Sequence, residues 1–221
     1  MDNSATIIQV ALSVLIIIIW AGYTYSKKRS EAFHAFARRR GLSFSKLAVT
    51  DVEKSFSAFR LFSEGFEKKM NNFISGEAGG AMILIFDYSY KYIFRTGEEG
   101  QSPQTQSQTV LITQSDRLNL PVFQLYPRNI FNKIFSALEK QVIDLQGHSE
   151  FSNAYVLKAD DKNNIKIVFA DQVLSYLVRH RGLTIEGNGN RLIFYRSNTL
   201  LKPDELNSFL DGGLELFRMM K

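Results

Sequence analysis

The first apolar segment of the chain is long and almost uninterrupted. Residues 5–25 read ATIIQVALSVLIIIIWAGYTY, and the polar side chains within this stretch are Gln9, Ser13 and Thr24. As a helix that rises about 1.5 Å per residue, the segment is about 31 Å long, close to the hydrocarbon thickness of a bilayer. Its distal end holds the aromatic residues that are typical of a headgroup interface: Trp20, Tyr23 and Tyr25. The pattern predicts a transmembrane helix over residues 5–25, preceded by a short extracytoplasmic tail over residues 1–4.

The residues that flank this segment favour a retained anchor over a cleaved secretory signal. A signal peptide needs a positive n-region, a shorter apolar stretch and a cleavage site between small residues. Here Asp2 precedes the segment, and Lys27, Lys28 and Arg29 follow it. Because no Lys or Arg comes before the span, the positive-inside rule predicts a domain that faces the cytoplasm from the inner membrane.

The net charge of +5 lies in one segment. Residues 26–41 form a basic juxtamembrane helix by their pattern, with six basic residues against Glu31: Lys27, Lys28, Arg29, Arg38, Arg39 and Arg40. The other 21 basic residues are balanced by 21 acidic ones. A nucleic-acid-binding domain would need a basic face of its own, and outside the juxtamembrane segment the charges balance. The sequence therefore does not favour a nucleic-acid-binding protein. We expect the six cations to be candidates for contact with anionic lipid headgroups.

The remaining chain, residues 42–221, has the pattern of one soluble domain. In residues 80–95, Phe86, Tyr88 and Tyr90 alternate with polar residues, as in a strand with one aromatic face. Further strands are predicted at 42–44, 68–76, 108–113, 121–126, 154–158, 183–186 and 191–195, and the last two surround the turn sequence GNGN. Helices are predicted over 30–40, with Ser30 as the N-cap, over 50–64, 129–138 and 171–180, and from Pro203 onward. The polar segment 97–108 is expected to be a hairpin tip.

Adjacent hairpins and segregated helices predict an α+β fold with a mainly antiparallel sheet and packed helices. The segments PVFQLYPRNIFNKIF and AYVLKADDKNNIKIVF each read as a strand, a polar turn and an Ile/Phe-bearing segment. This internal similarity would fit two similar half-domains within the soluble part.

Few residues suggest chemistry. Asp87 lies within an aromatic strand and is expected to form a structural ion pair, with Arg95 or Arg117 as the partner, to face solvent, or to serve as a ligand. Asp144, His148 and Glu150 are the nearest approach to a ligand cluster, but their spacing fits a solvated loop better than a metal site. The chain has no Cys, so thiolate metal sites, disulfides and thiol nucleophiles are excluded.

Five short runs of the chain form a distinctive set: Arg38-Arg39-Arg40-Gly41-Leu42, Phe86-Asp87-Tyr88-x-Tyr90, Gln108-Thr109-Val110, Leu120-Pro121-x-Phe123-x-Leu125-x-Pro127 and Phe151-Ser152-x-x-Tyr155-x-Leu157. With these runs the chain resembles a group of bacterial single-span membrane proteins. The resemblance implies bacterial origin, one N-terminal span and one domain. Since that group has no assigned activity, it implies no catalytic residue.

These observations favour a membrane-tethered cytoplasmic module that binds a protein partner in the same membrane. No catalytic residue, cofactor or metal is expected, and the sequence leans away from an enzyme. The alternative is an anionic-lipid-binding domain or a lipid-modifying enzyme, in which the basic segment meets the headgroups.

Overall fold

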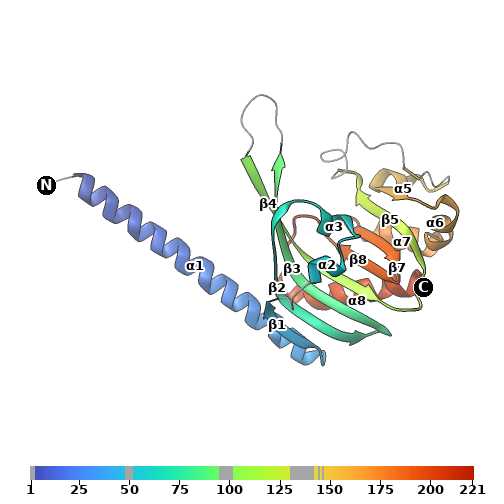
Figure 1. Ribbon diagram of the computed structural model, residues 1–221, viewed down its shortest axis with the longest axis horizontal. Coiled ribbons are helices and arrows are strands. Elements are labelled where there is room, and N and C mark those ends of the chain that lie inside the picture. Colours follow the sequence, from blue (N-terminus) through green and yellow to red (C-terminus); the bar gives the residue numbers. More distant parts are fainter. Residues whose placement is uncertain (1–2, 48–51, 95–101, 130–141, 144, 146) are drawn as a thin grey trace.

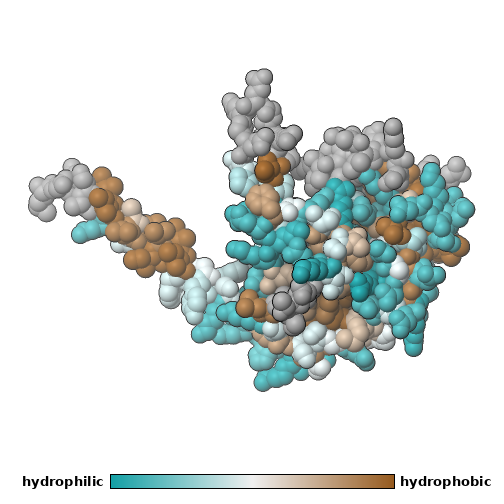
Figure 2. All heavy atoms as spheres, viewed as in Figure 1, coloured by the Kyte–Doolittle hydropathy of each residue, from teal (hydrophilic) through white to brown (hydrophobic). Residues whose placement is uncertain are grey.

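The computed structural model describes residues 3–47, 52–94, 102–129, 142–143, 145 and 147–221 (Figure 1). Helix α1 (Asn3–Arg39) contains 37 residues and projects far from the domain. Within the described residues, it is the helix with the length and composition of a membrane span. Figure 2 shows its apolar residues on the projecting part, away from the domain's largely polar surface.

The second part of α1 belongs to the domain core. Phe33, Phe36 and Ala37 are completely buried there. The predicted span and the predicted juxtamembrane helix are therefore one continuous helix. The expected helix start at Ser30 is wrong, because this residue lies inside α1 and its hydroxyl donates to the Asn72 side chain.

One eight-stranded antiparallel sheet forms the centre of the domain, in the order β1-β2-β3-β4-β8-β7-β5-β6. Its strands are β1 (Ser43–Leu47), β2 (Phe66–Ala78), β3 (Ala81–Phe94), β4 (Ser102–Gln114), β5 (Leu120–Pro127), β6 (Tyr155–Ala159), β7 (Thr184–Gly189) and β8 (Arg191–Tyr195). Hairpins join β2 to β3, β3 to β4 and β7 to β8, whereas the longer connection over residues 48–65 joins β1 to β2. Strands that are neighbours in the sequence are thus mostly neighbours in the sheet. The α+β fold with a mainly antiparallel sheet is confirmed.

Two β-hairpins can be compared with the turns predicted from the sequence. The β7–β8 turn is as expected, with Asn188 paired to Arg191 and Gly189 at a φ of 57°. The predicted tip at 97–108 is wrong for its second half, because β4 already begins at Ser102 and pairs with Phe94 of β3. Between Ser102 and Thr109, β4 pairs with β3 and not with β8. On its other side β3 stays paired with β2 as far as Lys91, so the ends of β3 and β4 extend past the rest of the sheet only beyond that residue (Figure 1).

Apolar residues cover both faces of the sheet. The larger cluster joins one face to α1, α5 (Ser149–Ala154), α6 (Lys162–Val168), α7 (Asp171–Arg179) and α8 (Leu206–Met219). A smaller cluster on the other face packs Phe56, Phe59 and Phe62 against β3, where Phe86, Tyr88 and Tyr90 are buried. The aromatic face predicted for residues 80–95 is thus a second core.

The predicted helices are partly confirmed. Helix α7 matches the prediction for 171–180, and α8 follows a short 3-10 turn, η2 (Pro203–Glu205). The predicted helix over 50–64 is described as two separate turns, α2 (Val52–Ser55) and α3 (Arg60–Ser63). Helices α5 and α6 were not predicted. The expected helix over 129–138 lies almost entirely outside the described residues, so the half-domain similarity stays a prediction.

Candidate functional site

The environment of α1 changes completely within one helical turn. Tyr25 is 62% exposed, whereas Arg29 is only 6% exposed. Arg29 lies where α1 meets the sheet, and its side chain points into the domain. This helix–domain junction contains a network of buried polar side chains.

Arg29 and Asp87 of β3 form a buried bidentate ion pair. Arg29 Nε lies 2.6 Å from Asp87 Oδ2, and Nη2 lies 2.7 Å from Oδ1. The third nitrogen, Nη1, donates to the carbonyl oxygen of Leu201 at 2.6 Å. The guanidinium carbon also lies 4.8 Å from the ring centroid of Phe33, one turn further along α1. Arg29 therefore connects α1, the sheet and the segment before α8.

Two neutral side chains complete the contacts of Asp87. Thr109 Oγ1 on β4 donates to Oδ1 at 2.9 Å, and Asn72 Nδ2 on β2 donates to Oδ2 at 2.8 Å. Asn72 reaches the carboxylate because it lies in a β-bulge with a φ of 56°. Ser30 then donates to Asn72 Oδ1 at 2.6 Å.

This geometry assigns Asp87 a structural role. A carboxylate has about four acceptor positions, and Asp87 receives two hydrogen bonds from Arg29, one from Thr109 and one from Asn72. No acceptor position is left for a metal ion or for a proton in catalysis. Burial alone would lower the pKa of Arg29, but the hydrogen bond and the charge of Asp87 outweigh it and raise that pKa. The guanidinium of Arg29 thus stays charged.

The structural ion-pair interpretation of Asp87 is correct, but its expected partner is wrong. Arg117 lies near Gly80, just before the start of β3, whereas Asp87 lies in the middle of that strand. Arg95 is outside the described residues. The partner is Arg29, a residue expected among the headgroup candidates. Because its side chain is buried and fully engaged, Arg29 is not available for a lipid headgroup.

The other basic residues of the juxtamembrane segment are exposed but occupy different levels along α1. Lys27 and Lys28 lie two and three residues after Tyr25. Arg38 and Arg39 lie at least 13 residues beyond Tyr25, which is about 20 Å along a continuous helix. Arg40 Nη2 lies 3.0 Å from each carboxylate oxygen of Asp211 on α8. Of the candidates, Lys27 and Lys28 therefore lie nearest to Tyr25 along α1.

A hollow of about 240 Å³ with a mixed polar and apolar lining lies beside the buried ion pair. Residues of α1, β1, β2, β3 and β4 line it, together with Leu200. The lining residues are Tyr25, Ser26, Arg29, Ser30, Lys46, Asn71, Asn72, Asp87, Tyr88, Ser89, Ser107 and Leu200.

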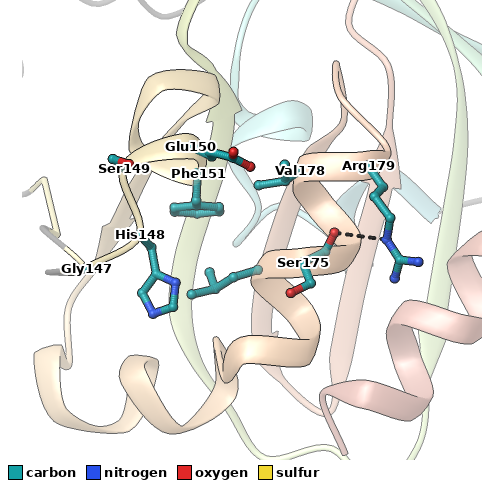
Figure 3. A pocket seen from close by; sticks show the side chains of 9 residues that line it. Gly147, His148, Ser149, Glu150, Phe151, Ser175, Val178 and Arg179 are labelled. Atoms are coloured by element: carbon teal, nitrogen blue, oxygen red, sulfur yellow. Dashed lines mark hydrogen bonds between the residues drawn. The ribbon is translucent and has the colours of Figure 1, made fainter.

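His148 lines a different cavity of about 370 Å³ between the start of α5 and helix α7 (Figure 3). His148 Nε2 lies 3.4 Å from Asp171 Oδ1, and Ser175 and Arg179 line the wall that α7 forms. This cavity shares no lining residue with the hollow beside Asp87. Asp144 lies outside the described residues. Asp87 and His148 thus belong to separate sites, and the described residues include no cluster of ligands suited to a metal ion.

Sequence reasoning missed a buried acid, Glu186 of β7, which is 1% exposed. Its carboxylate accepts hydrogen bonds from the backbone N–H groups of Arg60 at 2.7 Å and Leu61 at 3.2 Å. The Tyr195 hydroxyl donates to it at 3.1 Å. Burial raises the pKa of Glu186 to about 7, although these hydrogen bonds favour the charged form. The contacts attach α3 to the sheet.

Comparison with known proteins identifies the fold. Neither a comparison with protein families nor a search of characterised proteins finds a match to the sequence. Among solved structures, the crystal structure of the mycobacterial trehalose monomycolate transport factor A, TtfA, is similar, with a TM-score of 0.59. The match covers 87% of this chain and 96% of that chain, at 11% sequence identity. At this identity the likeness shows a shared fold.

Proposed function

We propose that this protein is a membrane-tethered cytoplasmic module that binds a protein partner in the same membrane. The observation that carries the proposal is the continuity of α1, whose exposed apolar part leads directly into the core helix that Arg29 fixes to Asp87. A rigid connection presents one face of the domain at a fixed height and rotation above the membrane. Tethering also raises the effective concentration of the domain for a partner in the same bilayer.

Two further findings support a non-catalytic role. Asp87 has no free acceptor position, and His148 lies in a separate cavity. The fold is shared with a protein that is named as a transport factor. By analogy of fold alone, we propose an accessory role in a membrane process.

The direct test is chemical crosslinking in intact cells, followed by purification of the full chain from solubilised membranes and mass spectrometry. We expect one membrane protein to be recovered reproducibly. A matched control replaces residues 5–25 with an unrelated span and keeps α1 in register with the domain. Recovery of the same partner with this control shows that the domain carries recognition. Recovery of no protein above background, together with turnover of a substrate by the purified chain, would refute the proposal.

Orientation can be tested separately, because the chain has no Cys. A Lys221→Cys variant should resist a membrane-impermeant maleimide in intact cells and react after permeabilisation. An Asn3→Cys variant should react in both conditions. The opposite pattern would place the domain outside the cytoplasm.

A second candidate function is binding to anionic lipids, with Lys27 and Lys28 as the favoured contacts because they lie close to Tyr25. Flotation of residues 26–221 with anionic vesicles tests it. Replacing Lys27 and Lys28 with Ala should weaken binding more than replacing Arg38 and Arg39. Absence of binding even at low salt would remove this function.

A further inference from the structure

We propose that the hollow at the helix–domain junction binds the headgroup of a membrane lipid that carries hydroxyl groups and one negative charge, as phosphatidylglycerol does. The inference rests on the membrane placement of α1 in the proposed function, and it does not depend on the protein partner.

The position of the hollow selects a ligand at the membrane surface. Tyr25 and Ser26 of α1 form part of its wall. Tyr25 ends the row of exposed apolar and aromatic residues on α1, and tyrosines at such a position lie at headgroup level. A ligand in the hollow is therefore beside the headgroups, with the apolar surface of α1 next to it.

Most of the residues that line the hollow have neutral side chains with a hydroxyl or amide group. Ser89 of β3 and Ser107 of β4 are directly opposite each other in the sheet, and both are partly exposed. Ser26 and the Asn71 amide add donors and acceptors from α1 and β2. Hydroxyl and amide groups of this kind are suited to a ligand with several hydroxyl groups.

The charge of the lining favours one negative charge on the ligand. The charges of Arg29 and Asp87 compensate each other within their ion pair. Of the described residues that line the hollow, Lys46 is the remaining charged one, and it is exposed. The lining therefore has a net charge of +1, which matches one phosphodiester.

The size of the hollow excludes a whole lipid. Its volume of about 240 Å³ is below the about 300 Å³ at which sites for drug-sized ligands begin. A glycerol phosphate group fits this scale. The acyl chains would then stay in the bilayer along α1, where Ile18 and Ile19 are exposed.

The test uses the full chain in nanodiscs of phosphatidylcholine that contain phosphatidylglycerol, with retained lipids measured by native mass spectrometry. We expect selective retention of phosphatidylglycerol. Ser107→Trp fills the hollow and should lower this retention about tenfold, since several hydrogen bonds are lost. Ser175→Trp is the matched control, because it fills the cavity beside His148 and should leave retention unchanged.

Charge and ligand source are distinguished in the same system. Lys46→Gln should lower retention of phosphatidylglycerol about fivefold without affecting a neutral glycosyl diacylglycerol. An excess of soluble glycerol 3-phosphate should not displace the lipid. The Ser107→Trp and Lys46→Gln variants should both keep the circular dichroism spectrum of the native chain.

Equal retention of the two phospholipids by the native chain, or unchanged retention in Ser107→Trp, would overturn the proposal. Displacement by glycerol 3-phosphate would overturn its lipid component, and a stronger preference for the neutral glycolipid would overturn its charge component. Partner recovery by crosslinking should be unchanged in Ser107→Trp if the partner binds elsewhere. Failure of the lipid site is thus distinguishable from failure of the proposed function.

Discussion

Removal of one charge from the Arg29–Asp87 pair should lower the free energy of unfolding far more than the small change in the side chain suggests. Asp87→Asn keeps the size of the side chain but leaves Arg29 charged at 6% exposure. The new amide group also places a donor where Arg29, Thr109 and Asn72 already donate. Breaking a buried ion pair in this way costs about 3–5 kcal/mol.

A double-mutant cycle separates the interaction from general damage. Arg29→Met alone leaves a buried carboxylate and should cost a similar free energy of unfolding. The double variant, Arg29→Met with Asp87→Asn, has no unpaired charge, so it should be less destabilised than the sum of the single variants by about 3 kcal/mol. Asp211→Asn in the exposed pair with Arg40 is the control, and it should cost less than about 1 kcal/mol.

The assay is urea unfolding of the full chain in detergent micelles, followed by near-ultraviolet circular dichroism of the tyrosines. The single tryptophan, Trp20, lies in the predicted span, so its fluorescence would not report on the domain. If Asp87→Asn is within about 0.5 kcal/mol of the native chain, or if the two single effects simply add, the reasoning is refuted.

Three other substitutions test the core and the buried acid. The pKa of Glu186 is about 7 in the folded state and near 4.5 in the unfolded state. The contribution of Glu186 to the free energy of unfolding is therefore complete below about pH 4.5 and is lost as pH rises through about 7. The loss is about 3 kcal/mol. Glu186→Gln should therefore reduce the loss of stability measured by urea unfolding between about pH 5 and about pH 8, and an unchanged loss would contradict this. Phe36→Ala should cost about 3–5 kcal/mol in the same assay, because Phe36 is completely buried; a cost below about 1 kcal/mol would place this part of α1 outside the core. Gly213→Ala should cost about 1–3 kcal/mol, since the new Cβ would lie 2.2 Å from Leu111 Cδ2, and native-like thermal stability would show that the contact relaxes.

Strong periodicity made much of the sheet predictable. In β3 the alternation of aromatic and polar residues identifies the strand and its two faces. The first half of β4 could not be found in this way, because SPQTQSQ contains no apolar residue. It forms a strand through its pairing with β3, for example Gln106 with Tyr90, and that tertiary contact overrides local preference.

The junction was only half predictable. A carboxylate within an aromatic strand indicates a buried pair, and Asp87 forms one. Its partner is 58 residues away on a helix whose other cations mostly face solvent, so local sequence does not distinguish Arg29 from Lys28. Ser30 was likewise predicted as a helix cap from local sequence alone. Its actual contact, with Asn72, depends on a bulge in β2, which local sequence does not reveal.

Glu186 could not be recognised from its strand. Residues 184–186 alternate as a half-exposed strand would, and a glutamate in such a pattern normally faces water. Strand β7 instead lies between β8 and β5, and α3 covers the carboxylate. The burial of Glu186 is thus a property of the assembled domain.

The central claim is that α1 continues without a break from the bilayer into the domain core. The most direct measurement uses pulsed electron paramagnetic resonance. It gives the distance between two nitroxide labels on a Tyr23→Cys, Arg38→Cys double variant in nanodiscs. Both positions are exposed, and the chain has no other Cys. For a continuous helix we predict one narrow distribution of distances, centred at about 22 Å, because 15 residues of helix span about this length. A broad distribution, or one with two separate distances, would contradict the account.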